Sequence, residues 1–139
     1  MQNPNEVLPA AAPTLSPLHQ AAQNGDVDGI LKALENGSPV DAQDEEGITA
    51  LMYAAHNGHV PAIHTLLQHQ AQIEARSRHE STPLMFAAEN GHFHAIEYLL
   101  RQQAQIEAQN ENGTTALMFA AQSGDVPAIE CLLQHGAQI

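Results

Sequence analysis

The sequence predicts an all-α repeat solenoid, in which short helix pairs stack in a row and extended turn segments project sideways between them. The first observation is repetition: GITALMYAAHNGH, TPLMFAAENGH and GTTALMFAAQSGD align with their threonines 33 residues apart. The second is that each stretch is followed by another helical pattern and then by a polar segment. The third is size, because a unit this small cannot bury its own apolar side chains and must stack on its neighbours.

The first 13 residues, MQNPNEVLPAAAP, are expected to form a disordered lead-in. Pro4, Pro9 and Pro13 stand among small residues, so the segment cannot run as a helix and has little apolar surface to bury. It also lacks the basic start and apolar core of a secretory signal. The repeat domain is therefore expected at residues 14–139, in units 11–43, 44–76, 77–109 and 110–139.

The first helix of each unit is expected to begin at a hydroxyl cap. Thr82 precedes a proline, which suits the first helical position because its missing N–H costs nothing there. Leu84, Ala87 and Ala88 then give an apolar stripe at i, i+3 and i+4. Gly91 is expected to end the helix, since glycine readily adopts the left-handed conformation. The equivalent caps in the other units are Ser16, Thr49 and Thr115.

The second helix is expected to begin directly after that glycine. Ile96 and Leu100 belong to its apolar stripe, which has helical spacing. In the first and last units, Asp26 and Asp125 stand at the helix start, where a carboxylate interacts favourably with the helix dipole. The polar stretch that follows, such as residues 109–113, is expected to form a finger that projects sideways before the next threonine.

The order T-P-L-x-x-A-A-x-x-G-H, then I-x-x-L-L, then A-x-I-x-A, at a period of 33, resembles the ankyrin repeat. The resemblance covers residues 11–139. It implies stacked antiparallel helix pairs with β-hairpin-like fingers at right angles, and a concave face made by the fingers and the first helices. It also implies a protein-binding, scaffolding function, because most known members of this family bind proteins and the family is associated with scaffolding and not with catalysis.

The chain departs from the family pattern at several positions. Only His19 keeps the family's histidine after the leucine, and the other units carry methionine, which is not expected to replace the imidazole hydrogen bond between units. Gln70 and Gln103 stand where the family has glycine after the second helix. If their backbones are left-handed, each substitution costs on the order of 1 kcal/mol.

The two ends of the stack differ. The first unit has Ala33 in place of a core leucine and adds Lys32 and Glu35, as expected of a terminal cap. The last unit keeps Leu132 and Leu133 of an internal unit, so its outer face is expected to expose an apolar patch. We therefore expect further structure to cover this end, through a longer chain or through self-association.

Composition argues against several classes of partner. The chain has 4 Lys and Arg against 16 Asp and Glu, and its formal net charge is -12. Nucleic acid and anionic membranes are not expected to bind, because their phosphates require cations. The single cysteine allows no intramolecular disulfide, which suits the cytosol of its own or of a host cell. No apolar run approaches the ~20 residues that span a bilayer.

No catalytic site, cofactor or metal is predicted. The sequence has no Gly-rich phosphate loop, no Gly-x-Ser-x-Gly and no recognisable Cys–His pair. Nine histidines are present, but a mild pH response is expected of them in preference to metal binding. Cys131 aligns with Lys32, Thr65 and Tyr98, a variable position, and is expected to be a partly exposed helix residue.

Positions that packing does not fix are candidates for contact with a partner protein. They include aromatic positions of the first helices, which either pack half-buried or line the concave face and anchor the partner. In the second unit the candidates are Glu45, Glu46, Ile48, Tyr53, His56 and Asn57. Arg76, the last residue of the second unit, is the candidate at the junction with the third. In the third unit the candidates are Arg78, His79, Ser81, Phe86, Glu89, Asn90 and Gln109, and in the fourth they are Glu111, Asn112, Thr114, Gln122 and Ser123.

Equivalent finger residues are expected about 10 Å apart, in rows along the stack. The expected rows are Glu45, Arg78 and Glu111, and Glu46, His79 and Asn112. Half of the four basic residues are Arg76 and Arg78. Two interpretations stay open: they neutralise neighbouring glutamates, or they dock a carboxylate or phosphate of the partner.

Two functions also stay open. The first is a non-catalytic protein–protein interaction module. The second is the targeting segment of a larger enzyme or effector whose catalytic domain follows Ile139.

Overall fold

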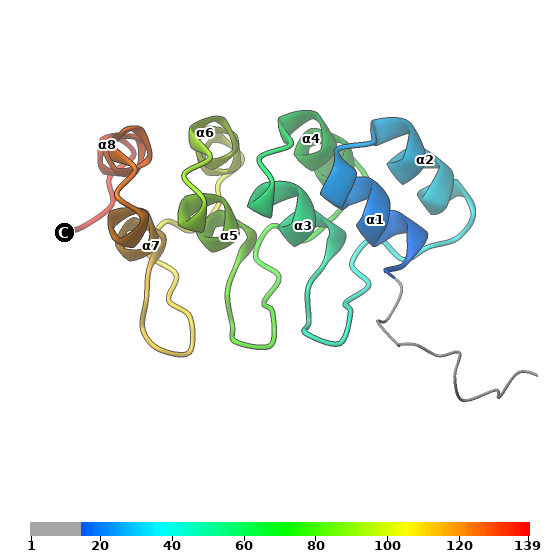
Figure 1. The fold of residues 1–139 in the computed structure, drawn as a ribbon, viewed down its shortest axis with the longest axis horizontal. Coiled ribbons are helices and arrows are strands. Elements are labelled where there is room, and N and C mark those ends of the chain that lie inside the picture. The colour runs from blue at the N-terminus through cyan, green and yellow to red at the C-terminus, as the bar shows by residue number, and fades with distance from the viewer. Residues whose placement is uncertain (1–14) are drawn as a thin grey trace, which may run out of the picture.

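Residues 15–139 form a row of eight helices, stacked as four antiparallel pairs, in the computed structural model of the chain (Figure 1). The pairs are α1 (Pro17–Asn24) with α2 (Val27–Glu35), α3 (Ala50–His56) with α4 (Val60–Gln68), α5 (Pro83–Glu89) with α6 (Phe93–Arg101), and α7 (Ala116–Ser123) with α8 (Val126–Gln134). The structure describes residues 15–139, and the expected lead-in at residues 1–13 lies outside them. The predicted all-α repeat solenoid is confirmed.

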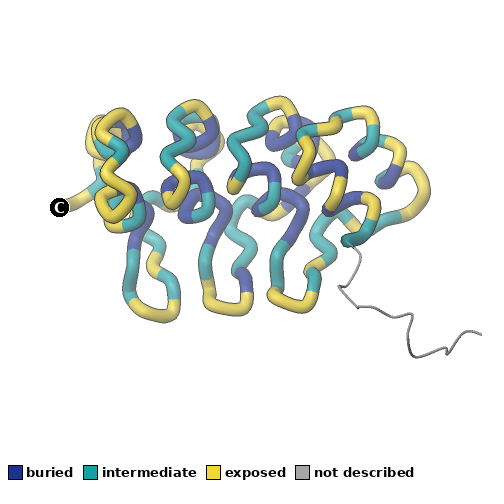
Figure 2. The backbone as a smooth tube through the Cα atoms, viewed as in Figure 1, coloured by how far each residue is buried: buried dark blue, intermediate teal, exposed yellow. Residues whose placement is uncertain are grey.

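Each helix packs on its partner in the pair and on the equivalent helix of the adjacent pair. The odd-numbered helices form one layer and the even-numbered helices the other, with the fingers hanging from the odd layer (Figure 1). Buried residues run along the facing sides of the helices, and the finger tips are exposed (Figure 2). Small residues such as Ala54 and Ala87, both fully buried, let the helices approach closely.

Each first helix begins at the predicted cap. In each case the side-chain oxygen of the capping residue accepts a hydrogen bond from the backbone N–H three residues further along, at 3.1 to 3.4 Å. The capping residues are Ser16, Thr49, Thr82 and Thr115. In α2 and α8 the predicted carboxylates act as caps, with Oδ1 of Asp26 accepting from Gly29 and that of Asp125 from Ala128, both at 3.0 Å. These local bonds satisfy N–H groups that have no partner within the helix.

The histidines at the starts of α4 and α6 have a structural role. Gly25 is left-handed, at φ +71°, and a Cβ there would lie 2.7 Å from Nδ1 of His59. Gly58 has the same conformation, and His92 approaches it equally closely. The Nε2 atom of His59 also lies 3.1 Å from the carbonyl oxygen of Gln23 in the preceding unit. Glycine is therefore required both by the backbone and by the ring of the next unit.

Methionine replaces only part of the bonding of the family histidine. His19 is buried, with its Nδ1 2.8 Å from Oγ of Ser16 and its Nε2 2.9 Å from the carbonyl oxygen of Ala42. In the next two units the methionine sulfur accepts a hydrogen bond from the N–H of the capping threonine. The distance from nitrogen to sulfur is 3.4 Å for Met52 and 3.5 Å for Met85. The sulfur thus keeps a contact to the cap but makes no bond to the distant carbonyl.

Three non-glycine residues are left-handed among residues 15–139. Gln70 and Gln103 both have φ of 74°, as the resemblance to the repeat family led us to expect. The third is Glu80, with φ of 68°, which stands at the finger position that Gly47 and Gly113 occupy in the neighbouring units. Sequence reasoning missed Glu80, although alignment at the period of 33 contains the signal.

The fingers are tight turns. In the finger of the second unit, the N–H of Asp44 donates to the carbonyl oxygen of Ile48 at 3.1 Å and that of Gly47 to Asp44 at 2.9 Å. The same pair of bonds closes the next two fingers. No strand is assigned anywhere in residues 15–139, so the β-hairpin-like character expected of the fingers is limited to these turns.

The apolar patch predicted at the C-terminal end of the stack is present in part: Leu133 is exposed, whereas Leu132 is fully buried. The large apolar side chains that are exposed within residues 15–139 all belong to the last unit, and they are Met118, Val126, Leu133 and Ile139. Met118 is 49% exposed, whereas Met52 and Met85 at the equivalent positions are 0% and 2% exposed. The difference arises because no helix pair packs on the outer face of α7 and α8 in this structure.

Candidate partner-binding surface

The predicted site residues fall in three regions along the finger side of the stack. None of them is buried. The finger tips carry Glu45, Glu46, Arg78, His79, Glu111 and Asn112. The returning arms of the fingers and the odd helices carry Ile48, Ser81, Thr114, Tyr53 and Phe86. The C-terminal ends of the odd helices carry His56, Asn57, Glu89, Asn90, Gln122 and Ser123.

A groove follows the junction between the fingers and the odd helices. It consists of three hollows, of about 720, 130 and 350 Å³. Tyr53 lines the first and second hollows, and Ile48 and Phe86 line the second and third, so adjacent hollows share walls. We call this feature the concave groove, and its lining includes His19, Ile48, Tyr53, His56, Phe86, Glu89 and Phe119.

The aromatic residues of the groove are half-buried and also line its hollows. Tyr53, Phe86 and Phe119 pack on the core and are only partly buried. Their other sides line the groove. The ring of His56 meets that of Phe86 edge-on, with centroids 6.1 Å apart. A partner in the groove would therefore contact side chains whose conformations are already fixed by packing.

Asp44 organises the N-terminal part of the groove. Its Oδ2 accepts a hydrogen bond from the hydroxyl of Tyr53 at 2.5 Å, and its Oδ1 accepts from the N–H groups of Glu46 and Ile48 at 2.9 Å each. Burial by itself raises the pKa of Asp44, but these hydrogen bonds outweigh it and the pKa is lowered overall. Burial and the adjacent carboxylate raise the pKa of Tyr53, so its hydroxyl stays a donor.

Sequence reasoning missed Asp44, although a signal was present. The equivalent residues at the period of 33 are Ser77 and Asn110, and aspartate, serine and asparagine are all typical of turn starts. The side chain of Asn110 accepts from the N–H of Thr114 at 2.9 Å, and that of Ser77 from Ser81 at 3.1 Å. All three side chains close their own finger, and only Asp44 also holds a groove residue.

The charged rows along the finger tips differ from those expected. Arg78 pairs with Glu46, at 3.4 Å between Nη1 and Oε2, and His79 contacts Glu111 at 2.5 Å. Each contact joins residues that are one position away from those aligned in the expected rows, where Arg78 stands with Glu45 and His79 with Asn112. The cause is the backbone: the N–H of Arg78 donates to the carbonyl oxygen of Glu46, and that of Glu111 to His79. These bonds offset each finger from the previous one.

Arg76 and Arg78 make different contacts within the stack. The Nη1 of Arg76 donates to the carbonyl oxygens of Glu80 at 2.8 Å and Gln109 at 2.7 Å, which ties its finger to the next one. One unit earlier, Gln43 donates from Nε2 to the carbonyl oxygens of Gly47 and Arg76. Arg76 thus takes over the structural role of Gln43, and Arg78 lies at the exposed tip.

Several candidates at the helix ends take part in contacts within the stack. Nδ2 of Asn57 donates to the carbonyl oxygen of Gln23, and Nδ2 of Asn90 to that of His56, both at 2.9 Å. Each amide therefore ties its unit to the preceding one. The hydroxyl of Ser123 donates to carbonyl oxygens of its own helix.

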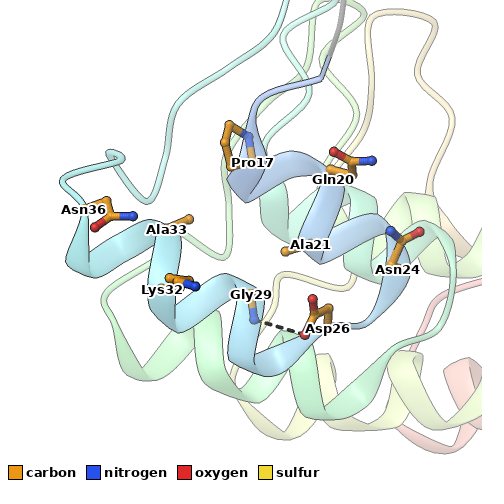
Figure 3. Close-up of a pocket in the computed structure, with 9 residues that line it drawn as sticks. All are labelled: Pro17, Gln20, Ala21, Asn24, Asp26, Gly29, Lys32, Ala33 and Asn36. Carbon is orange, nitrogen blue, oxygen red and sulfur yellow. Dashed lines mark hydrogen bonds between the residues drawn. The ribbon is translucent and has the colours of Figure 1, made fainter.

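A separate hollow of about 400 Å³ lies on the outer face of α1 and α2 (Figure 3). Ala21 and Ala33 belong to its lining, and Lys32 and Asn36 are among its polar side chains. Asp26 also lines it, but its carboxylate already accepts from the N–H of Gly29 within the helix start. This polar outer face contrasts with the apolar one at the other end of the stack.

The prediction for Cys131 is wrong, because its side chain is buried, with 2% exposed. It belongs to the core cluster together with Leu132 and Ala128. Burial raises the pKa of the Cys131 thiol most, and the charge of Glu97 raises it further.

Within residues 15–139 no group of three or more His, Cys, Asp or Glu side chains could hold a metal ion.

Comparison with known protein families identifies the repeat. A family model described as ankyrin repeats (3 copies) matches residues 18–110 and again residues 71–139. Together the two matches include all four helix pairs. No match was found among curated proteins. Of the helices in the described part of the chain, none has the length and apolar character needed to cross a membrane.

Proposed function

Because this chain belongs to the ankyrin repeat family, whose repeats generally serve as protein–protein interaction modules, we propose that it is a non-catalytic module that binds a partner protein in the concave groove and at the finger tips. The observation that carries the proposal is the run of adjoining hollows, whose lining comes from all four units. Its aromatic side chains are held by the core on one side and open on the other. Such rigid, partly exposed aromatic groups often dominate binding energy.

The finger tips extend the proposed surface beyond the groove. Arg78 and Glu46 are both well exposed, with 65% and 59% of their side chains accessible. Exposed pairs of this kind contribute little to stability, so they are available to exchange partners. The backbone bonds between fingers hold these charges in place along the stack.

A comparison of variants tests the groove directly. The intact chain and two variants are used in parallel to capture proteins from a lysate. Ile48→Ser changes the groove, and His94→Ser, at an exposed position of α6, is the matched control. We expect a set of proteins that the parent chain and His94→Ser retain and that Ile48→Ser loses. Identical captured sets for all three chains would contradict binding in the groove. Melting temperatures of the variants show whether a loss of capture reflects unfolding.

A further inference from the structure

We infer that the concave groove selects a cationic segment of another protein, one that carries an aliphatic or aromatic side chain between Lys or Arg residues. This inference rests on the proposed function, because it names the chemistry of the partner in the same groove. It depends on three features of the groove: an apolar centre, a rim of carboxylates, and the absence of cations from its lining.

The centre of the groove is apolar. The hollow of about 130 Å³ is lined by Ile48, Met52, Tyr53, His56 and Phe86. Its volume is about four times the share of one water molecule in the liquid. It therefore has room for one aliphatic side chain, which would displace water from Ile48 and from the ring of Phe86.

Carboxylates surround this centre. Glu89 and Glu46 line the hollow on one side, and Glu45 and Asp44 line the hollow on the other. Among residues 15–139 neither Glu45 nor Glu89 forms an ion pair, and both are exposed. Glu46 is the member of the rim whose charge is offset, by Arg78.

No Lys or Arg lines any of the three hollows. Arg76 is bonded to finger carbonyls, and Arg101 pairs with Glu97 at 3.1 Å. Lys32 lies on the outer face of the first helix pair (Figure 3). The field in the groove is therefore negative, and it favours cationic partners and repels anionic ones.

The same charges argue against the chain itself as occupant. Residues 1–14 contain Glu6 and no Lys or Arg, so they offer no cationic side chain to match the carboxylates of the rim. A second copy carries the same formal net charge of -12. A segment of another protein, with cations that match the rim and an apolar residue that fills the centre, satisfies both parts of the groove.

Selection from a display library of short random peptides tests the inference on the full chain. Each selected peptide is measured against three variants: Ile48→Ser, the rim variant Glu45→Gln/Glu89→Gln, and the control Glu35→Gln/Glu130→Gln. Glu35 and Glu130 are exposed on α2 and α8, so the control removes the same two charges away from the groove.

We expect the selected peptides to be net positive with an apolar residue among the cations. The rim variant should bind them about fivefold more weakly, as two exposed charges allow, and the control should bind them like the parent chain. Raising the salt concentration should weaken binding to the parent chain more than to the rim variant.

The possible failures are distinguishable. Peptides that lose binding in Ile48→Ser but are neutral or acidic would overturn the cationic partner and leave the groove as the binding site. Peptides that bind Ile48→Ser as well as the parent chain, or the absence of any selected peptide, would count against the groove itself and so against the proposed function. Equal weakening in the rim and control variants would assign the effect to net charge and overturn selection by the rim.

Discussion

The two left-handed glutamines provide a quantitative test of what the repeat requires of its backbone. Gln70 and Gln103 both have φ of 74°, and both side chains are exposed. A Cβ in this conformation approaches the following carbonyl oxygen, at a cost of roughly 1–2 kcal/mol. Glycine avoids this cost, but its greater freedom in the unfolded chain offsets part of the benefit. The free energy of unfolding should therefore rise by about 1 kcal/mol per site.

We therefore expect Gln70→Gly/Gln103→Gly to be more stable than the parent chain. The sites belong to different units, so their effects should add to about 2 kcal/mol. For a domain of this size that corresponds to a rise of about 8 °C in melting temperature. Urea unfolding followed by circular dichroism measures the free energy, and thermal unfolding measures the temperature.

The control is the same exchange at a right-handed position. Gln20 is exposed within α1, and Gln20→Gly should lower stability by about 0.5 kcal/mol through helix propensity. If the double variant is no more stable than the parent chain, the left-handed backbone carries no strain at these positions and our reasoning is refuted. A loss equal to that of the control would indicate that glycine acts only through the unfolded state.

Three further predictions follow from the same structure. Glu80→Gly relieves a left-handed backbone in the finger, and we expect about 1 kcal/mol of added stability in urea unfolding; an unchanged midpoint would contradict this. His19→Met keeps the buried volume but loses the bond from Nε2 to the carbonyl oxygen of Ala42, so stability should fall by about 1 kcal/mol; full stability would show that the bond is dispensable. Because the pKa of Asp44 is lowered, its carboxylate stabilises the fold at pH values above its ordinary pKa of 3.8. This contribution is lost as the pH falls through the lowered pKa. Asp44→Asn should therefore be less stable than the parent chain at neutral pH, and the difference should shrink on acidification; a constant difference at all pH values would exclude this linkage.

The helices could be predicted because their signals are local. The capping Ser16 and the three capping threonines act within a few residues, as do the prolines after Ser16 and Thr82 and the glycines at the helix ends. The burial of Leu51 and Ile63 followed from the same spacing, since stacking repeats the same contact in every unit. The left-handed glutamines could also be inferred, because glycine stands at the same position in two other units, at Gly37 and Gly136.

The finger contacts could not be predicted in the same way. Alignment places Arg78 level with Glu45, but the backbone bond between fingers moves it to Glu46. The role of Arg76 depends on two carbonyl oxygens in different fingers, and no sequence pattern reports the direction of a carbonyl. Cys131 was misjudged because a variable position was taken for an exposed one.

Nearest-neighbour stacking gives the concave groove unequal support along its length. Phe119 belongs to α7, whose pair packs against other helices on one side only, whereas Tyr53 lies in a unit flanked on both sides. The pair α7–α8 should therefore lose amide protection during hydrogen exchange before the two internal pairs. A ligand that reaches Phe119 would slow this exchange, and one that stops at Phe86 would leave it unchanged, so exchange rates at the far end measure how many units a bound segment spans.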